Sequence, residues 1–267
     1  MSGAWRIDQE EFLKSIPSIN ALKLRASYGQ TGNDGGGNTG QDAQDNTISY
    51  YAWQPLYGLG WNNASEAGIL QTSLGNRNLA WESSNAFDAA LEFSLFQGRV
   101  SGTVEYFDRR SSNLIFAVPL PLSAGISTVT RNIGTMYNRG FEVELGVEPV
   151  RTKDFVWHID LNATKIKNRI TKMPDENPEI IDGTKKLSVG HSIYDNWLRE
   201  YKGINPNTGE VEYRAASYVA ANSRITESGD TLTNSINNAR YHYNGSSIPA
   251  LTGGITNRFT FKGITLS

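Results

Sequence analysis

Strict alternation of apolar and polar residues, interrupted by one very short turn, is the feature of this sequence that most constrains its fold. The first stretch covers residues 87–95 and the second covers residues 100–106, with Gln97-Gly98 between them. A period of two places successive side chains on opposite faces of a β-strand, so each stretch has one apolar and one polar face. About ten residues at roughly 3.3 Å each, when tilted, suffice to cross a bilayer as a strand. The pattern therefore makes this polar-looking chain a candidate membrane protein.

Composition limits the alternatives. The 267 residues are enough for one large β domain or two ordinary ones, and a net charge of −2 gives no electrostatic case for a nucleic-acid partner. The chain has no cysteine, which excludes disulfides, thiolate metal sites and a cysteine nucleophile. Its apolar runs are shorter than the roughly 18 residues that a membrane helix needs, whereas a barrel strand needs only alternate residues to be apolar.

Similar alternation recurs along the chain, and the connections between the alternating stretches fall into two kinds. The predicted strands are residues 22–28, 87–95, 100–106, 141–148, 155–164, 255–261 and 264–266. Tight turns are expected at 97–98, 149–154 and 262–263, and long loops at 29–79, 110–138 and 171–250. In an up-and-down sheet this order places every tight turn at one end and every long loop at the other. Outer-membrane barrels show this asymmetry, whereas a soluble sandwich has no reason to sort its connections.

The polar faces fit an aqueous surface. Glu142, Glu144 and Glu148 share one face of a predicted strand. Three carboxylates in a dry core would each cost several kcal/mol unless paired, but they cost little when they face a water-filled lumen. The solvated outer face of a soluble sandwich explains them equally well. The barrel interpretation predicts that one set of apolar residues faces lipid: Phe87, Leu91, Phe93, Val104, Phe141, Leu145, Trp157 and Leu161.

Several segments resemble the SusC/RagA family of TonB-dependent outer-membrane transporters of Bacteroidota, and they occur in the family's order. They are LKLRASYGQTGN at 22–33, NLAWE at 78–82, FSLFQGRVSG at 93–102, NIGTM at 132–136, NRGFEV at 138–143, GINPNTG at 203–209 and GGITN at 253–257. Each segment is weak alone, but together their order and spacing are specific. The similarity extends from Trp5 to the end of the chain.

The resemblance implies an all-β, antiparallel, up-and-down transmembrane barrel of about 22 strands with a plug inside. It also implies a SusD-like surface lipoprotein, the TonB complex and membrane lipid as partners, and oligosaccharides or peptides as cargo. Residues 1–267 show no plug, no TonB-contacting segment, no signal peptide and no closing strand that ends in an aromatic residue. We therefore expect a partial barrel domain, truncated at both ends, from the C-terminal half of a bacterial outer-membrane protein.

Motifs for catalysis or cofactor binding are weak. Gly35, Gly37 and Gly40 have the G-x-G-x-x-G spacing of a dinucleotide-binding site, which requires a helix directly after the glycines. The residues that follow are poor helix formers, so a flexible loop is the better interpretation. The three histidines lack the spacing of a zinc site, and no serine lies in a G-x-S-x-G elbow. We therefore expect no enzyme activity and no catalytic, cofactor-binding or metal-binding residues.

One loop carries a cluster of aromatic residues: Tyr50, Tyr51, Trp53, Tyr57 and Trp61. Such side chains stack on sugar rings or seal a partner interface, although they also pack a loop on itself or sit at a membrane interface. They are the candidate ligand or partner contacts. Two alternatives to the SusC-like transporter stay open: another TonB-dependent receptor, for example for siderophores or other metal chelates, and a soluble β-sandwich that binds carbohydrate.

Overall fold

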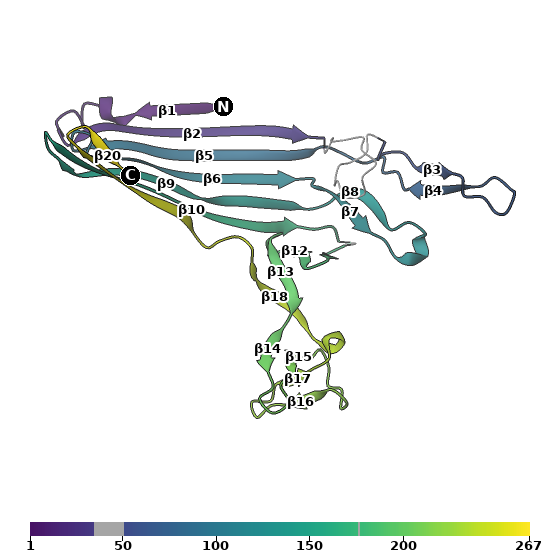
Figure 1. Ribbon diagram of the computed structural model, residues 1–267. Coiled ribbons are helices and arrows are strands. Elements are labelled where there is room, and N and C mark those ends of the chain that lie inside the picture. Colours follow the sequence, from purple (N-terminus) through teal and green to yellow (C-terminus); the bar gives the residue numbers. More distant parts are fainter. Residues whose placement is uncertain (35–50, 176) are drawn as a thin grey trace.

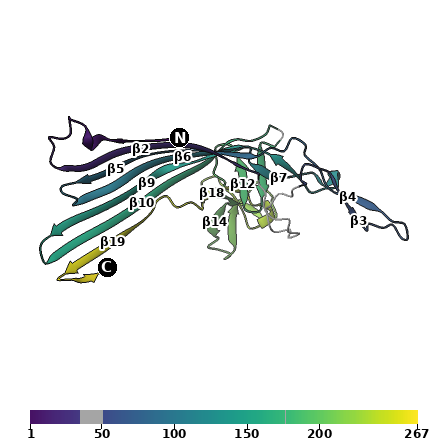
Figure 2. The ribbon, with the colours of Figure 1, turned by 90° about the horizontal axis from the view of Figure 1, so that it is seen from above.

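The computed structural model describes residues 1–34, 51–175 and 177–267, and its largest element is an antiparallel sheet of eight strands. The strand order is β1-β2-β5-β6-β9-β10-β19-β20, so β1 and β20 are the two free edges of an open, curved wall (Figures 1 and 2). The strands are β1 (Ser2–Arg6), β2 (Ile19–Asn33), β5 (Glu82–Leu95), β6 (Val100–Ser112), β9 (Thr135–Arg151), β10 (Phe155–Lys172), β19 (Thr252–Phe261) and β20 (Ile264–Leu266). The expected all-β, up-and-down partial barrel is confirmed.

The strands of the wall are longer than the alternation indicates. β6 continues to Ser112 and β9 begins at Thr135, although residues 110–138 were expected to be connective. The apolar positions stop earlier because both faces of a strand are wet beyond the hydrocarbon, while the hydrogen-bonded ladder continues. Hydropathy therefore predicts the part of each strand that faces lipid and misses its extension.

The predicted sorting of turns and loops is present. The turns that follow β5, β9 and β19 lie at one end of the wall, and the long connections 34–81, 113–134 and 173–251 leave from the other end (Figure 1). One turn is shorter than expected, because Pro149 lies inside β9 rather than in the turn. It falls at a register irregularity, where a residue without an N–H is tolerated.

The eight residues expected to face lipid all lie on one face of the sheet. Leu91 pairs with Val104 on the next strand. Phe93 pairs with Gly102, and Gly102 pairs in turn with Leu145. Phe141 is 54% exposed and Leu91 is 37% exposed. Within the described residues no second sheet packs on this face, so the β-sandwich alternative is wrong. An exposed apolar face of this kind suits hydrocarbon rather than a water-soluble core.

The opposite face of the wall is polar and partly ion-paired. Lys23 Nζ lies 3.1 Å from Glu92 Oε2, and Arg25 Nε lies 2.9 Å from Glu92 Oε1. Arg25 also forms an ion pair with Glu105 on the next strand but one. These charges fit the water-facing side of a barrel wall.

The long connections contain short sheets that the alternation did not predict individually. They hold β3 (Leu56–Leu59), β4 (Ile69–Ser73), β7 (Ile115–Pro119), β8 (Thr128–Asn132), β11 (Glu179–Asp182), β12 (Lys185–Ser188), β13 (Asp195–Arg199), β14 (Tyr201–Ile204), β15 (Val211–Arg214), β16 (Ser223–Ile225), β17 (Thr231–Thr233) and β18 (Tyr241–Ser246). In the described residues, three short 3-10 helices cover Ile7–Gln9, Leu122–Ala124 and Ile236–Asn238.

The main apolar core lies among these connections. Val118, Val129 and Ile133 from the β7–β8 hairpin pack with Ile180 of β11, and all four are buried. This cluster holds two of the long connections together beside the wall. In the part of the chain that the structure describes, no helix is long and apolar enough to cross a membrane.

Candidate functional site

The polar face of the wall carries a shallow pocket between β6, β9 and β10, in the half of the wall nearer the tight turns. Its volume is about 280 Å³, and its polar lining includes Thr103, Glu144 and Asn162. His158 also lines it, with Nε2 2.8 Å from Asp160 Oδ1 and Nδ1 3.4 Å from Glu148 Oε1. A surface with this mixture of acceptors, donors and charges can exchange hydrogen bonds with a polar solute.

Acidic residues dominate the centre of this face. Glu142 stands opposite Glu105, and Glu144 stands opposite Thr103. Arg25 pairs with Glu105, but among the described residues no cation pairs with Glu142 or Glu144, and both are exposed. Carboxylates that lie opposite each other destabilise a sheet unless solvent screens them. Their presence indicates that this side of the wall faces water.

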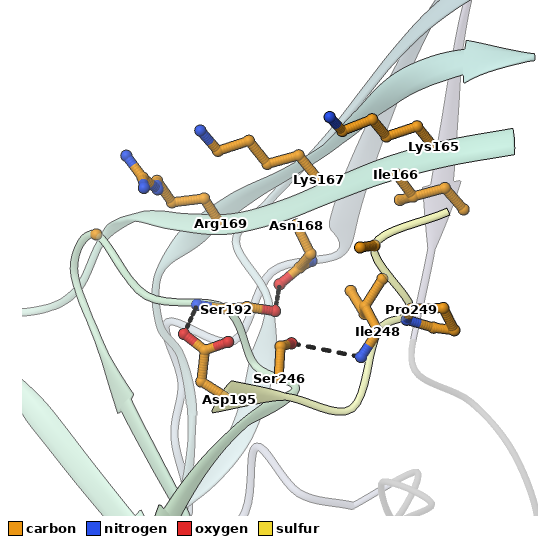
Figure 3. Close-up of a pocket in the computed structure, with 12 residues that line it drawn as sticks. Lys165, Ile166, Lys167, Asn168, Arg169, Ser192, Asp195, Ser246, Ile248 and Pro249 are labelled. Carbon is orange, nitrogen blue, oxygen red and sulfur yellow. Dashed lines mark hydrogen bonds between the residues drawn. The ribbon is translucent and has the colours of Figure 1, made fainter. Parts of the chain in front are cut away.

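The long-loop end of the wall is tied to residues 190–193 by two backbone hydrogen bonds of Ile170, with Gly190 and His191, and by the buried amide of Asn168. Asn168 Oδ1 accepts hydrogen bonds from the Ser192 hydroxyl at 2.8 Å and from the Ile193 N–H at 3.0 Å. Asn168 Nδ2 donates to Asn138 Oδ1 at 2.8 Å, so the side chain also links β10 to β9. The Ser192 N–H in turn donates to Asp195 Oδ2 at 3.0 Å. The loop after β12 is thereby fixed against the wall (Figure 3).

A second pocket, of about 320 Å³, surrounds this anchor. Ile166 and Asn168 form its wall side, and Ser246 at the end of β18 closes the other side together with Ile248 and Pro249 of the β18–β19 connection (Figure 3). Sequence reasoning did not single out these residues. Asn168 and Ser192 lie 24 residues apart in the sequence, and only the course of the loop brings their side chains into contact.

The loop aromatics predicted as contacts are partly described. Tyr50 lies outside the described residues, and so do Gly35, Gly37 and Gly40. Tyr51, Trp53, Tyr57 and Trp61 are all exposed, at 49% to 61% of their surface. No ring contact joins Trp53, Tyr57 and Trp61 to one another in the described part of the loop. The structure therefore presents them separately rather than as one stacking platform.

The β3–β4 hairpin presents apolar residues that sequence reasoning missed. Tyr57 and Leu59 share a face of β3, and Leu59 pairs with Ile69 of β4. Leu59 is 83% exposed and Ile69 is 65% exposed. The Trp61 indole lies over Gly58, where a Cβ atom would come within 3.0 Å of Trp61 Nε1. The hairpin projects beyond the wall at the end that carries the long loops (Figure 1).

A compact aromatic group supports the sheet formed by β11, β12, β13 and β18. The His191 and Tyr243 rings stack with centroids 3.5 Å apart, and the Trp197 ring lies edge-on to Tyr243 at 4.9 Å. Lys186 Nζ lies 4.5 Å from the centre of the Trp197 ring. The alternation of Tyr241 and Tyr243 was the only sequence signal for this group.

The outermost sheet, β14-β15-β17-β16, is stabilised by buried carboxylates paired with arginines. Arg224 donates through Nε and Nη2 to the Glu212 carboxylate, which lowers the pKa of Glu212 from its ordinary value, although burial opposes the shift. Burial acts most strongly on Glu200, but hydrogen bonds from Lys202 and Arg240 outweigh it and lower its pKa as well. These pairs hold the loop sheet in shape without a large apolar core.

The described residues hold no group of three or more histidine, cysteine or acidic side chains suited to a metal ion. What the geometry offers is an amphipathic wall with a charged, water-facing side and a structured set of connections at one end. This arrangement defines a segment of a barrel wall.

Comparisons with known proteins agree with this class. Residues 14–258 match the family described as TonB dependent receptor-like, beta-barrel. The TonB-dependent receptor P39 of Formosa agariphila is 30% identical over 242 residues, which cover 90% of this chain and 21% of that protein. The TonB-dependent receptor SusC of Bacteroides thetaiotaomicron is 30% identical over 240 residues, which cover 86% of this chain and 22% of SusC.

A solved structure shares the fold. The RagAB peptide transporter superposes with a TM-score of 0.76 at 23% identity, over 99% of this chain and 28% of that chain. The chain belongs to the TonB-dependent receptor-like β-barrel family, and its resemblance to SusC-type receptors is confirmed. It spans between 20% and 27% of the length of the curated relatives that it matches.

Proposed function

We propose that residues 1–267 form part of the barrel wall and the extracellular loops of a SusC-like, TonB-dependent transporter in the bacterial outer membrane. The observation that carries this proposal is the division of the wall into a continuous apolar face and a charged face. A wall of this kind separates hydrocarbon from an aqueous passage. The proposed role is transport, with no catalytic step.

The cargo of the proposed transporter is an oligosaccharide or a peptide. The solved relative RagAB is described as a peptide transporter, which supports the peptide alternative. The exposed carboxylates Glu142 and Glu144 and the hydroxyl and amide groups around them suit either cargo, because both are rich in hydrogen-bonding groups. In this proposal a SusD-like lipoprotein covers the loop side and the TonB complex supplies energy from the inner membrane.

Within this proposal, Tyr50, Tyr51, Trp53, Tyr57 and Trp61 contact the cargo or the lipoprotein. Support comes from the exposure of the four that are described and from their place on the projecting loop. Exposed aromatic side chains at a contact contribute through burial of their rings. Trp53→Ala and Tyr57→Ala are expected to weaken binding of cargo or lipoprotein by about tenfold or more each.

The matched control is Tyr218→Ala, which removes a comparably exposed ring from a different loop. Binding of the purified lipoprotein and of candidate cargo to the receptor is measured for each variant. Equal affinity in all three variants would remove these aromatics from the proposal.

Uptake tests the main proposal. A strain that lacks the receptor is supplied with defined oligosaccharides or peptides as its only nutrient, with and without the restored gene. Growth that returns with the gene, and only on one class of nutrient, identifies the cargo. If the gene changes growth on neither class and uptake of metal chelates depends on it instead, the SusC-like role is wrong.

A further inference from the structure

The outward face of β10 changes abruptly along the strand. Up to Ala163 its outward residues are apolar, and the next three outward positions are Lys165, Lys167 and Arg169. Figure 3 shows these three side chains on the opposite side of β10 from Asn168, which turns toward the loop sheet. The cations therefore belong to the lipid-facing side of the wall, just beyond the apolar band and at the end with the long loops.

A fourth cation lies beside them. Arg139 of β9 stands directly opposite Lys167, and its guanidinium lies 4.4 Å from the centre of the Tyr137 ring. We call Arg139, Lys165, Lys167 and Arg169 the basic row. All four are exposed. Outward neighbours along one strand lie about 7 Å apart and neighbouring strands about 5 Å apart, so one ligand can span several of these charges.

The basic row is not neutralised by the protein. Within the described residues none of its four members forms an ion pair with a carboxylate. Asp108 of β6 stands opposite Arg139 on the neighbouring strand. Its carboxylate is already held by Arg110 through two hydrogen bonds of 3.0 Å. Four cations so close together repel one another unless anions approach from outside.

The same face carries a hollow over β2, β5 and β6, of which β6 is the neighbour of β9. It has a volume of about 470 Å³ and is lined by the apolar rings of Phe87 and Tyr106 and by the polar ends of Tyr28, Asn85, Asp108 and Arg110. The Asp108 carboxylate in this lining is the one that Arg110 holds. The Tyr28 hydroxyl donates to Asn85 Oδ1 at 3.1 Å. An apolar floor with a polar rim, at the level where the hydrocarbon band ends, suits the junction between a lipid headgroup and its acyl chains.

We propose that the basic row binds the phosphate groups of anionic lipids in the leaflet on the long-loop side, with the hollow beside it holding the lipid's interfacial part. Arginine and lysine near a membrane surface attract anionic headgroups, and arginine pairs with phosphate through two parallel hydrogen bonds. The ligand is a membrane lipid rather than free phosphate because the row lies against the apolar band. This inference rests on the membrane placement in the proposed function but not on its cargo.

The test uses the complete receptor in nanodiscs of phosphatidylcholine mixed with phosphatidylglycerol. Native mass spectrometry and lipid extraction measure how strongly phosphatidylglycerol is enriched around the protein. In the triple variant K165Q/K167Q/R169Q the lipid affinity is expected to fall by about 100-fold, since each cation near an anionic surface contributes about a factor of five. The matched control R99Q/K153Q/K262Q removes three exposed cations at the tight-turn end and is expected to keep the wild-type enrichment.

Two further measurements separate the explanations. A spin label at Leu91 reports whether the wall lies in lipid, through its accessibility to a lipid-soluble quencher. If the label is accessible to the quencher but phosphatidylglycerol is not enriched, the lipid site is overturned and the membrane placement stands. The same conclusion follows if both triple variants lose the enrichment equally. A label shielded from the quencher overturns the membrane placement. Displacement of phosphatidylglycerol by millimolar inorganic phosphate would show a site for free phosphate and would also overturn the proposal.

Discussion

The Asn168 side chain accepts a hydrogen bond of 2.8 Å from the Ser192 hydroxyl, and this contact joins the end of a wall strand to the loop that follows β12. Asn168 is 5% exposed and Ser192 is 8% exposed, so water does not replace the bond easily. A buried polar group that loses its partner costs about 1–3 kcal/mol. Together with the backbone hydrogen bonds between Ile170 and residues 190 and 191, the contact therefore holds this loop against the wall.

We expect Asn168→Ala to loosen this attachment. The substitution leaves the Ser192 hydroxyl and the Ile193 N–H without their acceptor, and the local free energy of opening should fall by about 1–3 kcal/mol. Hydrogen exchange of residues 189–195 measures the change. Asn162→Ala on the same strand and face, where the side chain is exposed, is the control. Equal protection in both variants would show that the amide is not an anchor.

Gly140 is expected to be essential for the contact between β9 and β10. A Cβ atom there would lie 2.1 Å from the Lys165 carbonyl oxygen and 2.9 Å from the Phe107 ring. Gly140→Ala should therefore destabilise the barrel by about 1–3 kcal/mol through overpacking. Gly29→Ala in β2 meets no atom within 4 Å and is the matched control. Thermal unfolding in detergent compares the two, and identical midpoints would contradict the close packing.

The apolar face predicts a strong asymmetry between two arginine substitutions. Leu91→Arg places a charge near the middle of the apolar band and is expected to destabilise the folded barrel by about 2–4 kcal/mol. Thr103→Arg, on the polar face of the neighbouring strand, lies between Glu92 and Glu144 and should be tolerated. Folding into lipid vesicles under a urea gradient measures both. Greater damage from Thr103→Arg would reverse the assignment of the two faces.

Acid is expected to weaken the outermost loop sheet through Glu212. Its pKa in the folded chain lies below the ordinary value of 4.5 because Arg224 stabilises the carboxylate. The stabilisation is therefore complete above about pH 4.5 and is lost as the pH falls through the lowered pKa. The hydrogen-exchange protection factors of β15 and β17, which are corrected for the intrinsic exchange rate at each pH, should fall over that range.

Glu212→Gln should remove this pH dependence, whereas Glu227→Gln, at an exposed glutamate of the same sheet region, should retain it. Protection that does not change with pH in the unaltered chain would show that the Glu212–Arg224 pair does not stabilise the sheet.

The lipid-facing part of each strand was predictable from the sequence because its cause is local. A strand between hydrocarbon and water must alternate, so residues such as Leu91 and Glu92 carry the pattern themselves. The order of tight turns and long loops was readable for the same reason. The small loop sheets were not predictable, since strands as short as Thr231–Thr233 have too few residues to show a hydropathy period, even though Leu232 and Thr233 are buried.

Only part of the candidate site could be predicted from the sequence. Exposure of Trp53 and Tyr57 agrees with their prediction as contacts, but their binding role is still a prediction. The anchor between Asn168 and Ser192 and the basic row next to Arg139 depend on which segments the fold places side by side.

The sequence by itself determined a β-strand wall with one apolar face, because the alternation is written into neighbouring residues. Only the tertiary structure decided that no second sheet covers that face in the described chain, because sheet partners come from distant segments. It also decided which charges are neutralised. Arg25 forms an ion pair with Glu105 across an intervening strand, whereas the basic row forms no ion pair with a carboxylate among the described residues. The register of the strands, and not the composition, therefore decides which cations remain unpaired and can bind a ligand.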